Sequence, residues 1–200
     1  MDEGAVIDQT SSGIELKIVE AAIACVEKYG ISGTTNRRIA EIAGVNSAAI
    51  NYYFRSKEVL IDRVIKITLD NTFDWKDVEV LPGGNAIERC VTVFEHIIEG
   101  ACNFPGITRA HFYDLLIECK EDSPAVERLN QFLIHLSDDL KEKGSPLSIK
   151  ELRLATFQIA SGCLMMSIAP RAFRKGVGID MNDPKSRHEF VFRMVTKLLS

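Results

Sequence analysis

Apolar side chains recur every three or four residues along most of this chain, which is the spacing of one face of an α-helix. The first such stripe begins at Ile14 and ends at Gly30, a residue type that commonly terminates helices. Stripes of this period predict about nine helices, over residues 14–30, 35–43, 46–53, 56–75, 87–102, 112–119, 123–140, 148–169 and 183–198. No strand-like alternation of useful length interrupts them, so the pattern predicts an all-α fold.

The strongest interruption in this pattern is Leu81-Pro82-Gly83-Gly84, which separates the predicted helix 56–75 from the predicted helix 87–102. Residues 171–183 are predicted to form a loop before the last helix. Residues 154–170 carry no charge over 17 positions, and this stretch is too short and too polar for a membrane span. We therefore interpret this stretch as a buried core or interface helix.

The two short predicted helices, residues 35–43 and 46–53, are joined by a turn that contains Gly44, which is the arrangement of a helix-turn-helix. Asn46 is placed to cap the second helix by accepting from the amides of its first turn. The apolar positions expected to face the core are Ile39, Ala40, Ile42, Ile50 and Phe54. The exposed face of the second helix then carries Ser47, Ala48, Ala49, Asn51 and Tyr52.

Taken alone, the charge of the whole chain argues against a nucleic-acid partner, because 24 Lys+Arg against 28 Asp+Glu leave a net charge of −4. Residues 34–57 reverse the balance locally, with four basic residues against Glu41, a balance of +3. Phosphate contacts need cations and hydrogen-bond donors along a groove edge. Side chains that suit this role are Lys57 and the hydroxyls of Thr35, Ser47, Tyr52 and Tyr53.

The second short helix also carries candidates for reading bases. Asn51 has the amide that pairs with adenine, a contact that contributes about 1–3 kcal/mol of discrimination. Ala48 and Ala49 are small enough to let the helix sit deep in a groove, with a methyl group against thymine, or they are close-packed bystanders. For Arg37 and Arg38 the sequence leaves open whether the side chain contacts DNA, faces solvent or faces an acidic neighbour.

Two other functional classes find less support in the sequence. An enzyme is disfavoured because the chain has no His-Glu-x-x-His, no Gly-x-Ser-x-Gly and no P-loop, and the spacing of His111 and Asp114 is expected by chance. A helical protein-interaction module gives no reason for the arrangement of residues 34–57. We therefore expect no catalytic residue.

The cysteines and the N-terminus indicate the compartment. The five cysteines are odd in number and form no Cys-x-x-Cys pair, which argues against a disulfide framework and a zinc site. Residues 1–13 contain three acidic residues and no apolar run after a basic start, so they do not form a signal peptide. We expect a soluble cytoplasmic protein without a metal, a cofactor or a membrane partner.

Residues 34–60 read TTNRRIAEIAGVNSAAINYYFRSKEVL, which resembles the DNA-binding signature of TetR-type transcriptional regulators. The resemblance spans roughly residues 13–60 and is specific, because many fixed spacings agree together. Asn51 is a departure, since many members have Tyr there, and it bears on base preference and not on the fold. The resemblance implies a DNA-binding set of Thr35, Asn36, Arg37, Asn46, Ser47, Ala48, Ala49, Asn51, Tyr52, Tyr53 and Lys57.

The resemblance also implies a domain plan. Residues 1–55 correspond to a helix-turn-helix DNA-binding domain with its recognition helix at about 46–53, and residues 56–200 to a helical ligand-binding and dimerisation domain. Such proteins are homodimers, usually repressors that a small-molecule effector releases from palindromic operators on double-stranded DNA. The predicted helix 56–75 touches both domains, so we expect it to act as the lever between them.

In the family the last two helices form the dimer interface, here residues 148–169 and 184–199. The interface residues expected on this basis are Ala155, Gly162, Phe190, Met194 and Leu198. A pocket for a largely apolar effector is expected among Phe94, Ile98, Cys102, Phe112, Leu116, Phe157, Cys163 and Met166. His96, His111 and His135 lie off the centres of their stripes and are expected to be surface or hydrogen-bonded polar residues.

Overall fold

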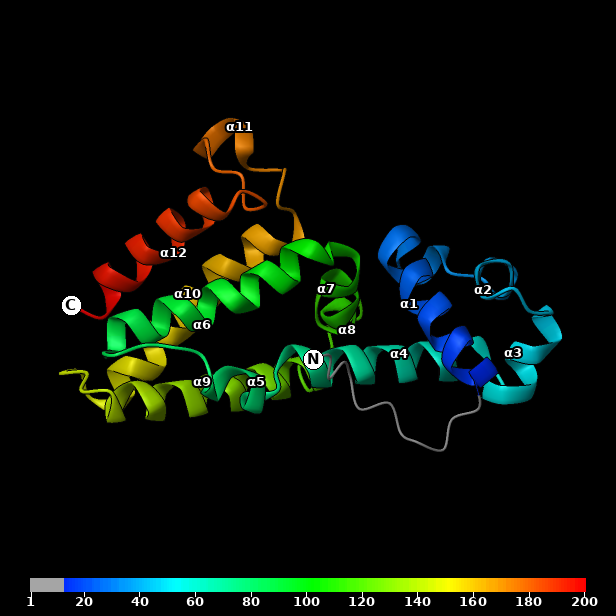
Figure 1. Cartoon of the computed structure of the whole chain (residues 1–200), viewed down its shortest axis with the longest axis horizontal. Helices are drawn as coiled ribbons and strands as arrows, with labels where there is room; N and C mark the ends of the chain where they lie inside the picture. The colour runs from blue at the N-terminus through cyan, green and yellow to red at the C-terminus, as the bar shows by residue number, and fades with distance from the viewer. Residues whose placement is uncertain (1–12) are drawn as a thin grey trace.

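The computed structural model describes residues 13–200, and each regular element within that range is an α-helix. Residues 1–13, which we predict do not form a signal peptide, lie outside the described residues except for Gly13. The helices of Figure 1 are α1 (Gly13–Gly33), α2 (Asn36–Ala43), α3 (Ser47–Phe54), α4 (Lys57–Thr72), α5 (Trp75–Glu79), α6 (Ala86–Asn103), α7 (Pro105–His111), α8 (Tyr113–Leu116), α9 (Pro124–Glu142), α10 (Ile149–Ile168), α11 (Arg174–Val177) and α12 (Pro184–Leu198). The predicted all-α class is confirmed.

The number of helices differs from the prediction, because the range 13–200 contains twelve segments instead of about nine. The additional ones are short, since α5, α7 and α11 have five, seven and four residues. A helix of one or two turns has too few residues to produce a periodic stripe. For this reason the predicted helix 56–75 ends at Thr72, the predicted helix 112–119 shrinks to one turn, and the predicted loop 171–183 contains α11.

Helix α1 is interrupted at Gly30, as the sequence predicts. The backbone there has φ 69° and ψ 175°, a conformation that glycine adopts without steric cost. Thr34 donates its hydroxyl to the carbonyl of Gly30 at 2.7 Å, which satisfies an acceptor at the interruption. The centre of the predicted stripe is fully buried at Ile18, Ala22 and Cys25.

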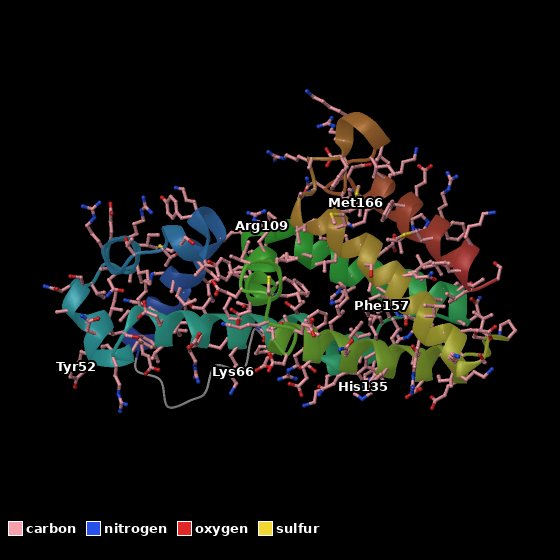
Figure 2. All side chains as sticks on the ribbon, turned by 180° about the vertical axis from the view of Figure 1, so that it is seen from behind. Tyr52, Lys66, Arg109, His135, Phe157 and Met166 are labelled. Atoms are coloured by element: carbon pink, nitrogen blue, oxygen red, sulfur yellow. The ribbon has the colours of Figure 1, made fainter. Side chains whose placement is uncertain are left out.

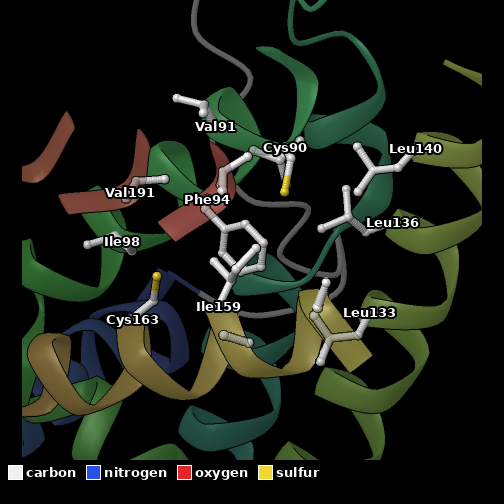
Figure 3. Close-up of a cluster of buried hydrophobic side chains, with 14 of the residues drawn as sticks. Cys90, Val91, Phe94, Ile98, Leu133, Leu136, Leu140, Ile159, Cys163 and Val191 are labelled. Carbon is white, nitrogen blue, oxygen red and sulfur yellow. The ribbon is translucent and has the colours of Figure 1, made fainter. Parts of the chain in front are cut away.

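The helices pack around two main hydrophobic cores. The first joins α1, α2, α3 and the N-terminal half of α4 as far as Val64, and it also takes Ile107 and Ala110 from α7. The packing of the N-terminal helices therefore does not stop at residue 55. The second core lies between α6, α9, α10 and α12. Figure 3 shows part of it, with Phe94 of α6 beside Ile159 of α10.

Helices α4 and α7 connect the two cores. Figure 1 shows α4 running from the group of α1, α2 and α3 toward α5, with α7 and α8 lying between the two groups of helices. Helix α7 packs against α1, α4, α6 and α10. A shift of either helix would therefore change the packing of both cores.

Helices α10 and α12 pack against each other within the protomer. A Cβ atom on Gly162 would lie 3.1 Å from the sulfur of Met194, so glycine allows this close approach. Large apolar side chains remain outside on the same two helices. We call this set the outer apolar row; it consists of Leu154, Phe157 and Met165 of α10 and Phe192 of α12, which are between 47% and 60% exposed.

Among the helices of residues 13–200, none has the length and the apolar character that crossing a membrane requires.

Candidate nucleic-acid interface and cavity

Local hydrogen bonds build the turn between α2 and α3. Thr35 caps α2 by accepting from the amide of Arg38, and Asn46 caps α3 by accepting from the amide of Ala48 at 2.9 Å. Between them Gly44 takes the left-handed conformation, with φ 66°. The predicted helix-turn-helix is therefore present, with its cap and its glycine in the expected places.

The inward face of this unit differs from the prediction at one residue. Ile39 and Ile50 are fully buried, and Phe54 is 6% exposed, as expected. Ile42 is 50% exposed, so the prediction that it faces the core is wrong. Ala43 takes its place, because the residue four positions after Ile39 returns to the same side of the helix.

The outward face of α3 carries four of the predicted DNA-binding residues. Ser47, Ala48, Asn51 and Tyr52 are exposed, and Tyr52 is the most open at 82%. Figure 2 shows Tyr52 at the end of the molecule remote from Phe157. Spacings of one, four and five residues put these side chains on one side of the helix.

Other predicted DNA-binding residues have additional contacts. Ala49 and Tyr53 are half-buried and pack on the first core, so each is partly a packing residue. Asn46 is exposed, but its side-chain oxygen already accepts the capping hydrogen bond from the amide of Ala48. Thr35 and Arg37 are exposed on α2 or at its start.

Arg38 does not face solvent or an acidic neighbour, the alternatives that the sequence leaves open. Its guanidinium lies 4.5 Å from the ring centroid of Tyr29 and donates to the carbonyl of Gly33. The arginine therefore secures the end of α1 against α2. Lys57 begins α4, where Ser56 caps the helix by accepting from the amide of Val59 at 3.3 Å.

A contact between α2 and α3 holds the candidate base-reading residue. Nδ2 of Asn36 donates to Oδ1 of Asn51 at 3.3 Å, while Oδ1 of Asn36 is buried without a hydrogen-bond partner. The bond fixes the plane of the Asn51 amide and leaves its own Nδ2 unpaired on the exposed face. Sequence reasoning placed both residues at the site but did not pair them, since they are fifteen positions apart.

A cavity of about 480 Å³ lies between α4, α6, α7, α9 and α10, in the size range of small-molecule sites. Four of the eight predicted pocket residues line it, namely Phe94, Ile98, Phe112 and Cys163. The other four, Cys102, Leu116, Phe157 and Met166, do not. Leu116 and Phe157 are 56% and 52% exposed because the single turn of α8 and the outer face of α10 direct them outward, and the other two are buried elsewhere in the core.

The pocket residues predicted from the sequence did not include the polar side chains that line the cavity. Nε2 of His111 on α7 lies 2.8 Å from the hydroxyl oxygen of Thr68 on α4, and both residues line the cavity. Burial lowers the pKa of His111 to about 4, so its imidazole is neutral at neutral pH. His96 also lines the cavity, whereas His135 lies in a separate hollow, 5.8 Å from the ring centroid of Trp75.

The side chains of the predicted dimer-interface residues are mostly packed inside the protomer and not on its outer face. Ala155 is 3% exposed and belongs to the second core, so its side chain does not reach an outer face. Gly162, Phe190, Met194 and Leu198 are half-buried, and the last three pack against that core. The helices expected to form an interface instead present the outer apolar row to the outside. Within residues 13–200 no group of three or more His, Cys, Asp or Glu side chains is placed to hold a metal ion.

Comparison with known proteins agrees with this geometry. The family model of the bacterial regulatory proteins of the tetR family matches residues 18–64, which is the interval from α1 through the capped turn into α4. The N-terminal part of the chain is therefore similar to the tetR family of regulatory proteins. The cavity and the outer apolar row lie almost wholly outside the matched residues.

Curated relatives resemble the same N-terminal part. The transcriptional repressor KstR2 of Rhodococcus jostii is 34% identical over 68 residues, which are 33% of this chain and 33% of that protein. Matches to the first curated relatives span about a quarter to a third of their length. These relatives are transcriptional regulators and not enzymes.

Solved structures resemble nearly the whole chain at low sequence identity. A TetR transcriptional regulator from Legionella pneumophila is 19% identical with a TM-score of 0.67, and the match covers 96% of this chain and 100% of that chain. The transcriptional regulator FadR from Bacillus subtilis in complex with stearoyl-CoA is 16% identical with a TM-score of 0.61, covering 92% and 97%. At these identities the likeness establishes the fold.

Proposed function

We propose that this protein is a homodimeric transcriptional repressor that binds a palindromic operator and is released from it by a small-molecule effector. The observation that carries the proposal is the outward face of α3, where Asn51 and Tyr52 are exposed next to Lys57 at the start of α4. A helix of this kind fits the major groove, with phosphate contacts on either side of it. The relation to KstR2 supports the sign of regulation.

The outer apolar row supports dimerisation. Four large apolar side chains on α10 and α12 are about half exposed, and two of these helices from each protomer would form a symmetric contact. Two copies of α3 then lie on one face of the DNA, about 34–36 Å apart or at a related helical spacing.

The cavity supports regulation by a small molecule, because its walls belong to the helices that connect the two cores. Oε2 of Glu27 on α1 accepts from the amide of Ile107 on α7 at 2.9 Å, and Ile107 lines the cavity. Thr68 and His111 join α4 to α7 on the cavity wall. A ligand that favours one arrangement of α4 and α7 would thereby change the placement of α3. The regulator FadR from Bacillus subtilis, which has a similar fold, is in complex with stearoyl-CoA, and this supports the proposal that the cavity takes a small molecule.

The proposal is tested by selecting binding sites for the purified protein from random duplex DNA, followed by competition binding. A palindromic site recovered from the pool and bound in preference to shuffled DNA supports it. A pool that stays random after repeated rounds, with no complex in gel shifts, contradicts it and leaves a helical interaction module as the alternative.

Lys57→Ala is expected to weaken binding to all DNA sequences and to reduce the salt slope of the affinity by about 0.9 for each protomer, because one phosphate contact is lost. The measurement is operator affinity by fluorescence anisotropy as a function of salt. Lys66→Ala is the matched control, since Lys66 is an exposed lysine farther along the same helix (Figure 2). A loss confined to one base pair would show that Lys57 is not a phosphate contact.

Asn51→Ala is expected to relax base choice at one or two positions in each half-site, at a cost of about 1–3 kcal/mol on the preferred sequence. Asn36→Ala is expected to relax the same positions less, because the amide of Asn51 then loses its orienting bond. The measurement is the base distribution after selection with each variant, and Asn130→Ala on the exposed face of α9 is the control. Unchanged base frequencies with Asn51→Ala would remove this residue as a base contact.

A further inference from the structure

Most hydroxyl groups that line the cavity are already hydrogen-bonded within the protein. Thr72 donates to the carbonyl of Thr68 at 2.8 Å, and Thr108 donates to the carbonyl of Phe104 at 3.0 Å. Ser167 donates to the carbonyl of Cys163 at 2.8 Å. Each hydroxyl has one hydrogen, which these bonds use, so the wall presents mainly apolar surface to a ligand.

Charge on the cavity wall is similarly limited. Among the described residues the lining contains no Lys, Arg or Asp, and its only carboxylate belongs to Glu99 at the exposed edge. That carboxylate lies 3.2 Å from the guanidinium of Arg187. Arg109 of α7 is also engaged, because it donates to the carbonyl of Ile168 at 2.9 Å. An anionic ligand would therefore find no unpaired cation among the described lining residues, and a buried charge without a partner is strongly unfavourable.

His111 is the buried polar group of the lining that these internal bonds leave incomplete, whereas Asn71, His96 and Asn103 lie at its exposed edge. The hydroxyl oxygen of Thr68 lies 2.8 Å from the carbonyl of Val64 and 2.8 Å from Nε2 of His111. We assign the single hydroxyl hydrogen to the Val64 carbonyl, and with that assignment Nε2–H donates the bond to Thr68. The neutral imidazole then carries its lone pair on Nδ1. No other described residue hydrogen-bonds to this ring, which is 5% exposed and lines the cavity.

We propose that the cavity binds an uncharged, largely apolar molecule that donates one hydrogen bond, from a hydroxyl or an amide N–H, to Nδ1 of His111. This inference rests on the proposed function, because it names the chemical class of the effector. The apolar part of the ligand lies against Phe94, Ile98, Phe112 and Phe132. The hydrogen bond places the ligand on α7, the helix that contacts Glu27 of α1.

The experiment compares four probes of similar length with the full chain at neutral pH: decanol, methyl octyl ketone, decanoate and decylammonium. Trp75, the single tryptophan, reports binding because its ring lies 5.7 Å from that of Phe132 on the cavity wall, and a thermal shift gives a second readout. The ketone, which cannot donate, is expected to bind about three- to tenfold more weakly than decanol. The two ions are expected to bind at least about a hundredfold more weakly. Equal or tighter binding of the ketone or of either ion overturns the inference.

Variants test whether the preference for decanol over the ketone depends on the imidazole of His111. His111→Leu is expected to bind decanol about three- to tenfold more weakly while the ketone is unaffected, so the preference disappears. His135→Leu, in the separate hollow, keeps the preference. If His111→Leu does not fold, Thr68→Val is used instead. In that variant the imidazole loses the bond that sets its tautomer, so the ratio of decanol affinity to ketone affinity is expected to fall. A preference that survives in the folded variant overturns the role of His111.

Operator binding without any probe is measured on the same samples. Discrimination among the probes without operator binding contradicts the proposed function alone. Operator binding with a preference for decanoate contradicts the ligand class alone. The two proposals therefore fail separately.

Discussion

Phe157→Glu is expected to convert the dimer to a monomer and to reduce operator affinity by at least about a hundredfold, the effect of losing an interface hot spot. Phe157 is 52% exposed in the middle of the outer apolar row, between Leu154 and Met165 on the same face of α10. In a two-fold symmetric contact the substitution occurs twice, so two unpaired carboxylates are placed in an apolar interface. A single protomer would then contact only one half-site.

This prediction is checked by light scattering coupled to size-exclusion chromatography, and by fluorescence anisotropy with the selected operator. Ile117→Glu is the matched control, because Ile117 is an equally exposed apolar residue, at 62%, just beyond α8. We expect that control to remain dimeric and to bind the operator normally. A Phe157→Glu protein that stays dimeric at low micromolar concentration would show that the outer apolar row is not the interface.

Gly106→Ala is expected to destabilise the protein by at least about 3 kcal/mol, at the upper end of overpacking effects. The added Cβ would lie 2.1 Å from the carbonyl oxygen of Glu27 and 2.6 Å from its Cα. These are backbone atoms of α1, whose neighbours Cys25 and Val26 are fully buried, so they cannot move aside cheaply. Helix α7 would have to separate from α1, and the amide of Ile107 would lose its bond to Glu27.

The measurement is urea denaturation followed by circular dichroism, together with operator affinity. Gly100→Ala is the control, since Gly100 lies inside α6 and a Cβ there meets no atom within 4 Å. That variant is expected to be more stable by up to about 1 kcal/mol, because alanine favours a helix. Wild-type stability of Gly106→Ala would mean that the close contact between α7 and α1 is not required for folding.

The elements that the sequence predicts well are those whose signals are local. Gly30 interrupts α1, Gly44 makes the turn, and Asn46 and Ser56 cap the helices that follow. Each of these effects depends on a few consecutive residues, so spacing and residue type suffice to predict it. The short helices α5, α7 and α11 escaped prediction because they have no stripe to detect.

The cavity was less predictable, for a physical reason that Phe157 and Phe94 illustrate. Both are aromatic residues on long apolar helices, yet Phe157 faces outward and Phe94 lines the cavity. Periodicity tells which residues share a face, but α6 and α10 each have more than one apolar face. The choice of face depends on how α6, α9, α10 and α12 pack together, which involves residues far apart in the chain.

The sequence by itself determined the all-α class, the helix-turn-helix and four of the five residues predicted on the exposed face of α3, because hydrophobic period and capping act over one or two turns. Only the tertiary structure decided which side chains meet across helices. It paired Asn36 with Asn51 and Thr68 with His111, positions that are 15 and 43 residues apart. Such contacts follow from the crossing of helices, and no pattern within one helix encodes them.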